Sequence, residues 1–242
     1  MSKSLANIII ANYSVHSLAL ICWAKQNLKN DFCVLSVDTG FASEDWQDYL
    51  TKVIAWLDNA SIEYHHLKSD NTFAELVNAR KQFPSQQFSW CAGFLKGITL
   101  LNKIDELDPD ADATILLSHR KDLSKASALL KNLDEEEKYD YRALEYPLLD
   151  KSFYEIEALV QDLPFEPVFR SRECQPCIHF TKKEFESIAT QDKQKVIQLE
   201  LQNQTFMFGS QSFDNLESDF FTKNNIMLEL SKACSWEYSC GL

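Results

Sequence analysis

Short apolar runs alternate along the first half of the chain with segments whose apolar positions recur every three or four residues. The apolar runs of strand length are residues 7–10, 32–37 and 114–117, and residues 63–67 are predicted as a further strand. Helices are predicted over residues 17–28, 43–57 and 124–133. Strands that alternate with helices in this order favour a doubly wound, mostly parallel sheet with helices on both faces, which is an α/β fold.

Capping boxes mark further helix starts, because a Ser or Thr three residues before a Glu satisfies the first backbone N–H groups of a helix. Such boxes begin at Thr72, Ser152 and Thr181. The second half of the chain is therefore predicted to be more helical than the first. No Pro- or Gly-rich linker divides the chain. We expect an α/β domain over residues 1–169 and a helical, cysteine-bearing C-terminal region over residues 170–242.

Composition and charge narrow the class of protein. Of the 242 residues, 45% are hydrophobic and 25% are charged, which is typical of a globular domain. The formal charge of −12 repels nucleic acid and anionic lipid. We therefore do not expect the chain to bind nucleic acid directly on its own. The acidic run at residues 134–138 is predicted to be a solvated loop or a helix end.

No targeting signal and no apolar stretch of membrane-spanning length is visible, so a cytoplasmic location without membrane association is expected. In a reducing compartment, seven cysteines do not indicate a disulfide framework. Clustered cysteines then suggest metal or redox chemistry, and isolated ones suggest packing. Cys22 and Cys33 lie inside apolar patterns and are predicted to be core residues, and His65 and His66 are predicted to be structural.

Polar segments follow three of the predicted strands, at the sheet edge where parallel α/β folds bind ligands. Hydroxyls, helix N-terminal amides and the Arg120 guanidinium suit a phosphate or sulfate group. His16 and His119 are read either as ligand contacts or as ordinary structural histidines. The candidate nucleotide- or sulfate-binding residues in these segments are Asn12, Tyr13, Ser14, His16, Ser17, Asp38, Thr39, Gly40, His119, Arg120 and Ser124.

A C-x-x-C motif at Cys174 and Cys177 lets two thiolates hold one metal ion or one cluster edge. By itself the motif is consistent with a metal site, with dithiol redox chemistry or with coincidence. Cys91 and Cys240 are further candidates, and Cys240 lies two residues from the end of the sequence.

Several short motifs occur in one order along about 170 residues, and they are similar to those of the phosphoadenosine phosphosulfate (PAPS) reductase family. That family belongs to the adenine nucleotide α-hydrolase-like superfamily. The matching segments are Ser36–Phe41 (family V-D-T-G-F), Phe83–Ser85 with Trp90–Cys91 and Leu95–Lys96 (F-P-S…W-C-x-x-x-L-K), Arg120–Ser124 (R-x-x-E-S), Tyr146–Asp150, Leu163–Pro167 and Cys174–Ile178 (C-x-P-C-I).

The resemblance implies an adenine nucleotide α-hydrolase-like fold and an adenine nucleotide or sulfonucleotide ligand. It implies a [4Fe–4S] cluster on Cys91, Cys174 and Cys177, with zinc as the alternative, and it places Lys96 beside the ligand or the cluster. Cys240 has two readings. It is either the fourth metal ligand or a catalytic nucleophile that attacks a sulfonyl sulfur.

The chain also departs from the family. ATP pyrophosphatases of the superfamily carry S-G-G-K-D-S after the first strand, and residues 11–17 lack both glycines, the Lys and the Asp. ATP activation with pyrophosphate release is therefore not expected. The tail lacks the Glu and His of the reductase motif E-C-G-L-H, and Ala92 stands where cluster-bearing reductases have a second cysteine.

Three functions are consistent with these features. The first is an enzyme of sulfonucleotide reduction or sulfur transfer that uses an electron donor. The second is a catalytically degraded, nucleotide-binding accessory subunit of a nucleic-acid sulfur-modification or CRISPR-type defence complex, which would meet nucleic acid through a protein partner. The third is a zinc-stabilised structural module without a ligand.

Overall fold

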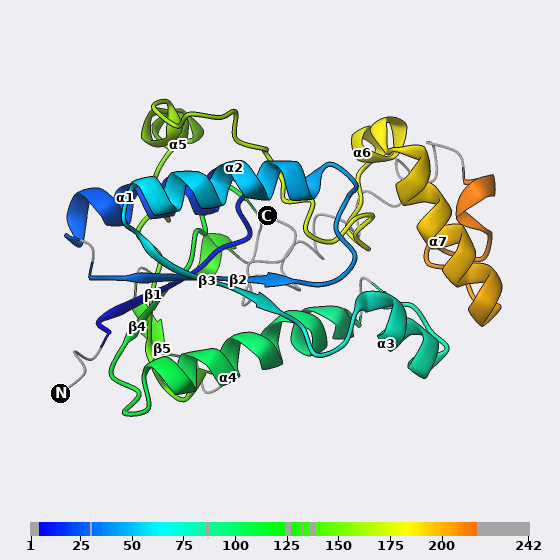
Figure 1. Cartoon of the computed structure of the whole chain (residues 1–242), viewed down its shortest axis with the longest axis horizontal. Helices are drawn as coiled ribbons and strands as arrows, with labels where there is room; N and C mark the ends of the chain where they lie inside the picture. Colours follow the sequence, from blue (N-terminus) through cyan, green and yellow to red (C-terminus); the bar gives the residue numbers. More distant parts are fainter. Residues whose placement is uncertain are drawn as a thin grey trace.

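The protein is built on one six-stranded sheet (Figure 1). The computed structural model describes residues 5–29, 31–85, 88–123, 127–131, 133–135 and 139–216. The strand order is β3-β2-β1-β4-β6-β5, and only the β5–β6 pair is antiparallel. The expected doubly wound, mostly parallel α/β sheet is confirmed. The strands are β1 (Asn7–Ile10), β2 (Cys33–Asp38), β3 (Glu63–Lys68), β4 (Thr114–Leu116), β5 (Leu133–Glu135) and β6 (Ala143–Glu145).

Helices cover both faces of this sheet. One face packs against α1, α2 and α5, and the other packs against α4 (Figure 1). A π-helical turn at Ala92–Gly97 leads into α4. The α-helices are α1 (Val15–Asn27), α2 (Trp46–Asn59), α3 (Phe73–Arg80), α4 (Ile98–Leu107), α5 (Phe153–Val160), α6 (Lys182–Ser187) and α7 (Thr190–Asn203).

The central strand β1 shows why apolar runs predict the sheet correctly. Ile9 packs into the layer of α1, α2 and α5, whereas Ile8 and Ile10 pack towards α4. Successive side chains of a strand point to opposite faces, so a strand that is covered on both faces needs apolar residues throughout. Burying each isoleucine contributes about 1.5–3 kcal/mol.

A third apolar cluster joins α3 and α7 to the C-x-x-C segment. Phe73 of α3, Val196 of α7 and Ile178 belong to it, and Cys91, Cys174 and Cys177 pack at its border. The C-terminal segment is thus attached to the first half of the chain by apolar contacts. The boundary expected at residues 169 and 170 remains a prediction.

All three predicted capping boxes are present. In the first box, the backbone N–H of Glu75 donates to Thr72 Oγ1 at 3.2 Å. The backbone N–H of Thr72 donates in turn to the Glu75 carboxylate at 2.7 Å. Both bonds satisfy donors that would otherwise lack a partner at the start of α3.

Thr72→Ala is expected to lower the free energy of unfolding by about 1 kcal/mol, because it removes the N-cap acceptor of α3. Urea denaturation measures the change. Thr51→Ala is the matched control, because the exposed Thr51 hydroxyl only donates to the Gln47 carbonyl within α2. An equal loss in both variants would show that the capping box contributes nothing.

The helix predicted over residues 124–133 is wrong. Ser127–Leu129 forms a short 3-10 turn, and Leu133–Glu135 forms β5, which pairs with the outer edge of β6. The unpaired backbone edge of β6 outweighs the weak local preference for helix. The acidic run at residues 134–138 therefore begins inside a strand rather than in a loop. Two helices that the sequence did not predict, α4 and α7, complete the described part of the fold.

In the part of the chain that the structure describes, no helix is long and apolar enough to cross a membrane.

Candidate functional site

Three of the four cysteines predicted to bind metal line one cavity, called here the thiol cavity. Cys91 precedes the π-helical turn, whereas Cys174 and Cys177 lie on the loop before α6, and all three are half-buried thiols. The cavity has a volume of about 40 Å³ and opens to solvent. Its other lining residues are Thr39, Ala92, Leu95, Lys96, Arg170, Ser171, Glu173, Gln175, Phe180 and Glu184. Cys240 lies outside the described residues.

A buried ion pair forms part of the same wall. Lys96 Nζ lies 2.5 Å from Glu173 Oε1, and both side chains are less than 8% exposed. Burial raises the pKa of Glu173, and the Lys96 ammonium opposes that rise. The Lys96 ammonium, whose charge is neutralised by the Glu173 carboxylate, therefore lies in the wall that also contains the three thiols.

The loop after β2 is joined to the C-x-x-C loop. Phe41 forms a parallel bridge with Cys174, and the Gln175 N–H donates to the Phe41 carbonyl at 2.8 Å. Thr39 Oγ1 donates to the Glu173 carbonyl at 2.6 Å. Of the residues predicted in this segment, Thr39 reaches the thiol cavity through these contacts.

Gly40 allows this loop to turn. Its φ of +65° is in the left-handed region, and a Cβ there would lie 2.5 Å from Thr72 Cγ2. Its N–H donates to Asp38 Oδ1 at 2.8 Å. Asp38 and Gly40 therefore shape the loop, and their predicted ligand contacts remain predictions.

A second group of predicted residues, called here the strand-end cluster, lies where β1 and β4 end. These strands are adjacent and parallel, and the strand order reverses between them, which is where doubly wound folds bind ligands. The cluster is fully or almost fully buried and consists of Asn12, Ser14, His16, Ser17, Ser118, His119 and Arg120. Ser124 lies outside the described residues.

Several polar atoms of the strand-end cluster have no hydrogen-bond partner among the described residues. They are Ser14 Oγ, both ring nitrogens of His16, Ser118 Oγ and Arg120 Nη1. A buried polar group without a partner costs about 1–3 kcal/mol, so such groups are rare in folded proteins. Their concentration at one point of the sheet edge favours a polar ligand there.

The donors in this cluster match an anion. Arg120 donates through Nε and Nη2 to Asp122, which leaves Nη1 for another acceptor. Burial and the nearby Arg120 charge lower the pKa of His16 to about 4. His16 is therefore neutral at pH 7 and offers one donor and one acceptor.

Two aromatic rings cover the strand-end cluster. Phe169 makes an edge contact with the His16 ring at 5.7 Å, and Phe153 lies 5.4 Å from the Arg120 guanidinium carbon. The cover lowers the local polarity, which strengthens hydrogen bonds to a bound anion.

Other predicted residues support the loop. Asn12 Oδ1 accepts from the Ser14 N–H and from Ser17 Oγ, both at 3.0 Å. Tyr13 has a φ of +56°, and its hydroxyl accepts from Ser36 Oγ at 3.0 Å inside the core. The ligand roles predicted for Asn12, Tyr13 and Ser17 remain predictions.

Sequence reasoning missed Glu173 and the cover formed by Phe153 and Phe169. It placed the segment that begins at Ser118 at the ligand-binding edge but did not choose Ser118 as a candidate residue. Ser118 directly follows a predicted strand, and that position was a usable signal. No signal in the sequence indicated that Glu173 pairs with Lys96, 77 residues away.

No protein-family model matches the chain, and a search of curated proteins also finds no match. Among solved structures, the chain is similar to the U34-tRNA thiolase NcsA from Methanococcus maripaludis, solved with its [4Fe–4S] cluster. The TM-score is 0.51 at 14% identity, over 89% of this chain and 79% of the thiolase. This likeness is one of fold, and it agrees with an adenine nucleotide α-hydrolase-like architecture.

The chain is also similar to the NH3-dependent NAD synthetase from Campylobacter jejuni in complex with the nitrate ion. That TM-score is 0.45 at 14% identity, over 95% of this chain and 86% of the synthetase.

Proposed function

We propose that the chain is an iron–sulfur protein that binds an adenine nucleotide or sulfonucleotide and acts in sulfur transfer or sulfonucleotide reduction. The observation that carries this proposal is the convergence of Cys91, Cys174 and Cys177 on the thiol cavity. The resemblance to the PAPS reductase family and the fold shared with a cluster-bearing thiolase support it.

The donor set of the thiol cavity fits a cluster. Thiolates are the ligands of iron–sulfur clusters, and they also bind zinc. A tetrahedral zinc ion with bonds of about 2.3 Å holds two thiolates about 3.8 Å apart. Among the described residues, only Cys33, Glu63 and His65 form a group with all ligand atoms within 4.8 Å of one another. At least one pair of cavity thiols is therefore more than 4.8 Å apart.

The residues of the thiol cavity would supply the ligands of the cluster and set the charge around it. Cys91, Cys174 and Cys177 would hold the cluster, which when bound would supply electron transfer or an iron site for sulfur. Burial raises the pKa of the Cys177 thiol, so binding has to displace its proton. Arg170 lines the same cavity, and its positive charge opposes the rise in the Cys177 pKa.

The strand-end cluster would hold the anionic group of the nucleotide. Arg120 Nη1 provides a charged donor, and Ser14, Ser118 and the neutral His16 provide further polar atoms. The two Phe rings would restrict access of water. This arrangement binds phosphate or sulfate without the glycine-rich loop that residues 11–17 lack.

Anaerobically purified protein is expected to show broad visible absorption and to contain about four irons and matching sulfide per chain. Cys174→Ser is expected to lose most of this iron, because it removes a thiolate from the cavity. Cys22→Ser is the matched control, since Cys22 lies on α1, and it should keep the iron. Protein that carries zinc alone, or no metal, would contradict the proposal.

Cys240→Ser separates the two roles of the terminal cysteine. If Cys240 is the fourth ligand, the iron is lost with the substitution. If the iron is retained while turnover of PAPS or adenylyl sulfate is lost, Cys240 is the nucleophile.

A second candidate function is the accessory subunit, and the loss of the glycine-rich loop favours it. It predicts nucleotide binding without turnover when the purified chain is given PAPS or adenylyl sulfate with a thiol reductant. Robust turnover by the chain alone would exclude it.

A further inference from the structure

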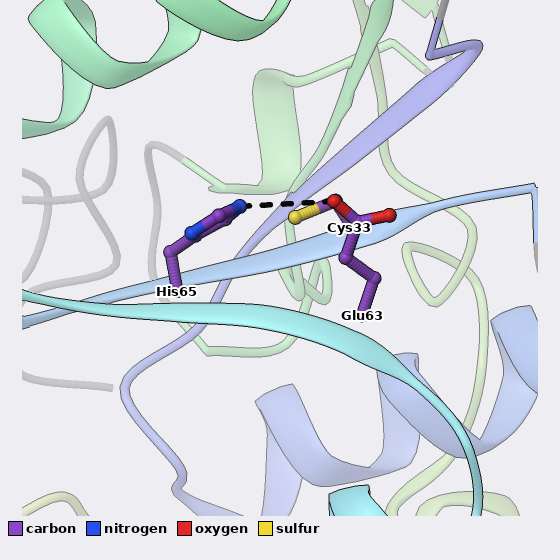
Figure 2. A group of neighbouring side chains, drawn as sticks. All are labelled: Cys33, Glu63 and His65. Carbon is purple, nitrogen blue, oxygen red and sulfur yellow. Dashed lines mark ion pairs between the residues drawn. The ribbon is translucent and has the colours of Figure 1, made fainter. Parts of the chain in front are cut away.

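Cys33, Glu63 and His65 meet near the amino-terminal ends of β2 and β3, whereas the strand-end cluster lies at the carboxyl ends of β1 and β4. Figure 2 shows the three side chains. Cys33 begins β2 and Glu63 begins β3, and the two residues are partners in the parallel register. His65 is two residues further along β3, so its side chain lies on the same face as that of Glu63. Cys33 packs in the layer that contains Leu100 and Ile104 of α4, which identifies this face.

The three side chains direct ligand atoms towards one another. The Cys33 sulfur, a Glu63 carboxylate oxygen and a His65 ring nitrogen all lie within 4.8 Å of one another. His65 Nε2 lies 3.7 Å from Glu63 Oε1, which is too far for a hydrogen bond. This nitrogen is buried and has no hydrogen-bond partner among the described residues. Cys33 Sγ donates to the Val34 carbonyl at 3.9 Å, and His65 and Glu63 lie at ion-pair distance (Figure 2). A central ion would bind all three atoms at once.

We propose that Cys33, Glu63 and His65 bind a zinc ion. Thiolate sulfur, imidazole nitrogen and carboxylate oxygen are together the ligands of zinc in proteins. Magnesium and calcium prefer oxygen alone, and an iron–sulfur cluster needs several thiolates. Glu63 is 59% exposed at its side chain, so water can complete a tetrahedral site. The Cys33 thiol releases its proton to solvent when zinc binds.

The charged side chains of α4 that face the proposed site do not prevent a zinc ion from binding there. Lys103 is the cation that acts on Cys33, and it would repel zinc. Glu106 accepts from Lys103 at 2.8 Å, which neutralises that charge, and Glu106 also acts on His65. The α4 groups that face the site therefore carry no net positive charge.

The consequence of zinc binding is structural. β3 is the outer strand of the sheet, and within the described ranges of the chain its open backbone edge has no strand partner on that side. A zinc ion held by one residue of β2 and two of β3 ties the outer strand to its neighbour. Because an ion that binds only the folded state stabilises it, saturating zinc should raise the melting temperature by roughly 5–10 °C.

The test uses the full chain with Cys174 and Cys177 replaced by Ser, so that the thiol cavity does not compete. Zn²⁺ is titrated calorimetrically, and Co²⁺ is added in parallel because a bound thiolate gives it a charge-transfer absorption. One equivalent of each metal is expected to bind. Cys33→Ala should abolish the Co²⁺ absorption, and His65→Gln should weaken Zn²⁺ binding by more than about 100-fold, beyond the loss seen for outer-shell partners. Cys22→Ala is the matched control, because Cys22 lies on α1 and outside the proposed site, and it should bind Zn²⁺ and Co²⁺ as the parent does.

Two results would overturn this inference. One is the absence of Zn²⁺ binding when Cys174 and Cys177 are Ser, and the other is unchanged binding in His65→Gln. If Cys33→Ala does not fold, zinc binding is tested instead in His65→Gln and Glu63→Gln, because both of these side chains are partly exposed. Circular dichroism checks that these variants fold. The inference does not rest on the proposed function. Loss of iron in the thiol cavity and loss of zinc here are measured separately.

Discussion

Replacing Lys96 by Met is expected to lower the free energy of unfolding by about 3 kcal/mol at pH 7. The Lys96 ammonium is the ion-pair partner of Glu173 in a wall that excludes water from both side chains. Without it, Glu173 either remains as an unpaired buried charge or takes up a proton, and both states cost free energy. The effect is large because the pair is buried, unlike most ion pairs at a protein surface.

The loss caused by Lys96→Met is expected to depend on pH in one direction. Burial raises the pKa of Glu173, and removal of the Lys96 charge raises it further. A carboxyl with a raised folded-state pKa contributes stability below its unfolded pKa of about 4.3. That stability is lost as the pH rises through the folded-state pKa. The variant should therefore be closest to the wild type in acid and furthest from it at neutral pH.

Urea denaturation of the metal-free chain between about pH 5 and pH 8 measures this, provided that the m-values agree. Lys96→Met combined with Glu173→Gln should return to within about 1 kcal/mol of the wild type, because no unpaired charge remains. Lys121→Met is the control for an exposed pair, since Lys121 bonds Asp150 in solvent, and it should cost at most about 1 kcal/mol. A deficit that grows as the pH falls would contradict the assignment.

Replacing Arg120 by Leu is expected to weaken the binding of adenylyl sulfate or ATP by about 100-fold. The change removes one charged hydrogen bond, from Nη1, and such a bond contributes about 1.5–3 kcal/mol. Each 1.4 kcal/mol corresponds to about a factor of ten in affinity. Isothermal titration calorimetry measures the dissociation constant.

Two further variants show whether the geometry of Arg120 matters. Arg120→Lys keeps the positive charge but loses the planar fork, so an intermediate affinity is expected. Lys121→Ala removes the neighbouring cation, which is exposed, and should leave binding unchanged. Wild-type affinity in Arg120→Leu would place the anion outside the strand-end cluster.

The elements that could be predicted from sequence are those whose residues are covered on both faces or capped locally. The strands β1, β2 and β4 are buried apolar runs, and a short run of this kind predicts a strand from the local sequence alone. The capping boxes were equally reliable, because both partners of each box lie within four residues.

The helix α7 shows what the hydrophobic pattern does not contain. Its buried face includes Asp192, Glu200 and Asn203, which are polar. Glu200 accepts from the backbone N–H groups of Met207 and Phe213, so its burial depends on a loop outside the helix. A residue buried through such bonds is indistinguishable in sequence from an exposed one.

The candidate site was predicted as separate motifs, and the structure shows how they meet. The assignment of Cys91, Cys174 and Cys177 as ligands of one cluster followed from the family resemblance. Their convergence depends on the sheet, on the π-helical turn and on the bridge between Phe41 and Cys174. Such long-range packing has no local signature, and for the same reason the Lys96–Glu173 pair was not predicted.

The position of β1 has a consequence for the nascent chain. β1 is first in sequence but lies between β2 and β4 in the sheet. During synthesis it can pair with β2 early, whereas its other edge stays uncovered until Thr114–Leu116 has been made. An apolar strand with an open edge is prone to pair with other chains. The interval in which α3 and α4 are being made is therefore the time when the nascent chain is most exposed to aggregation.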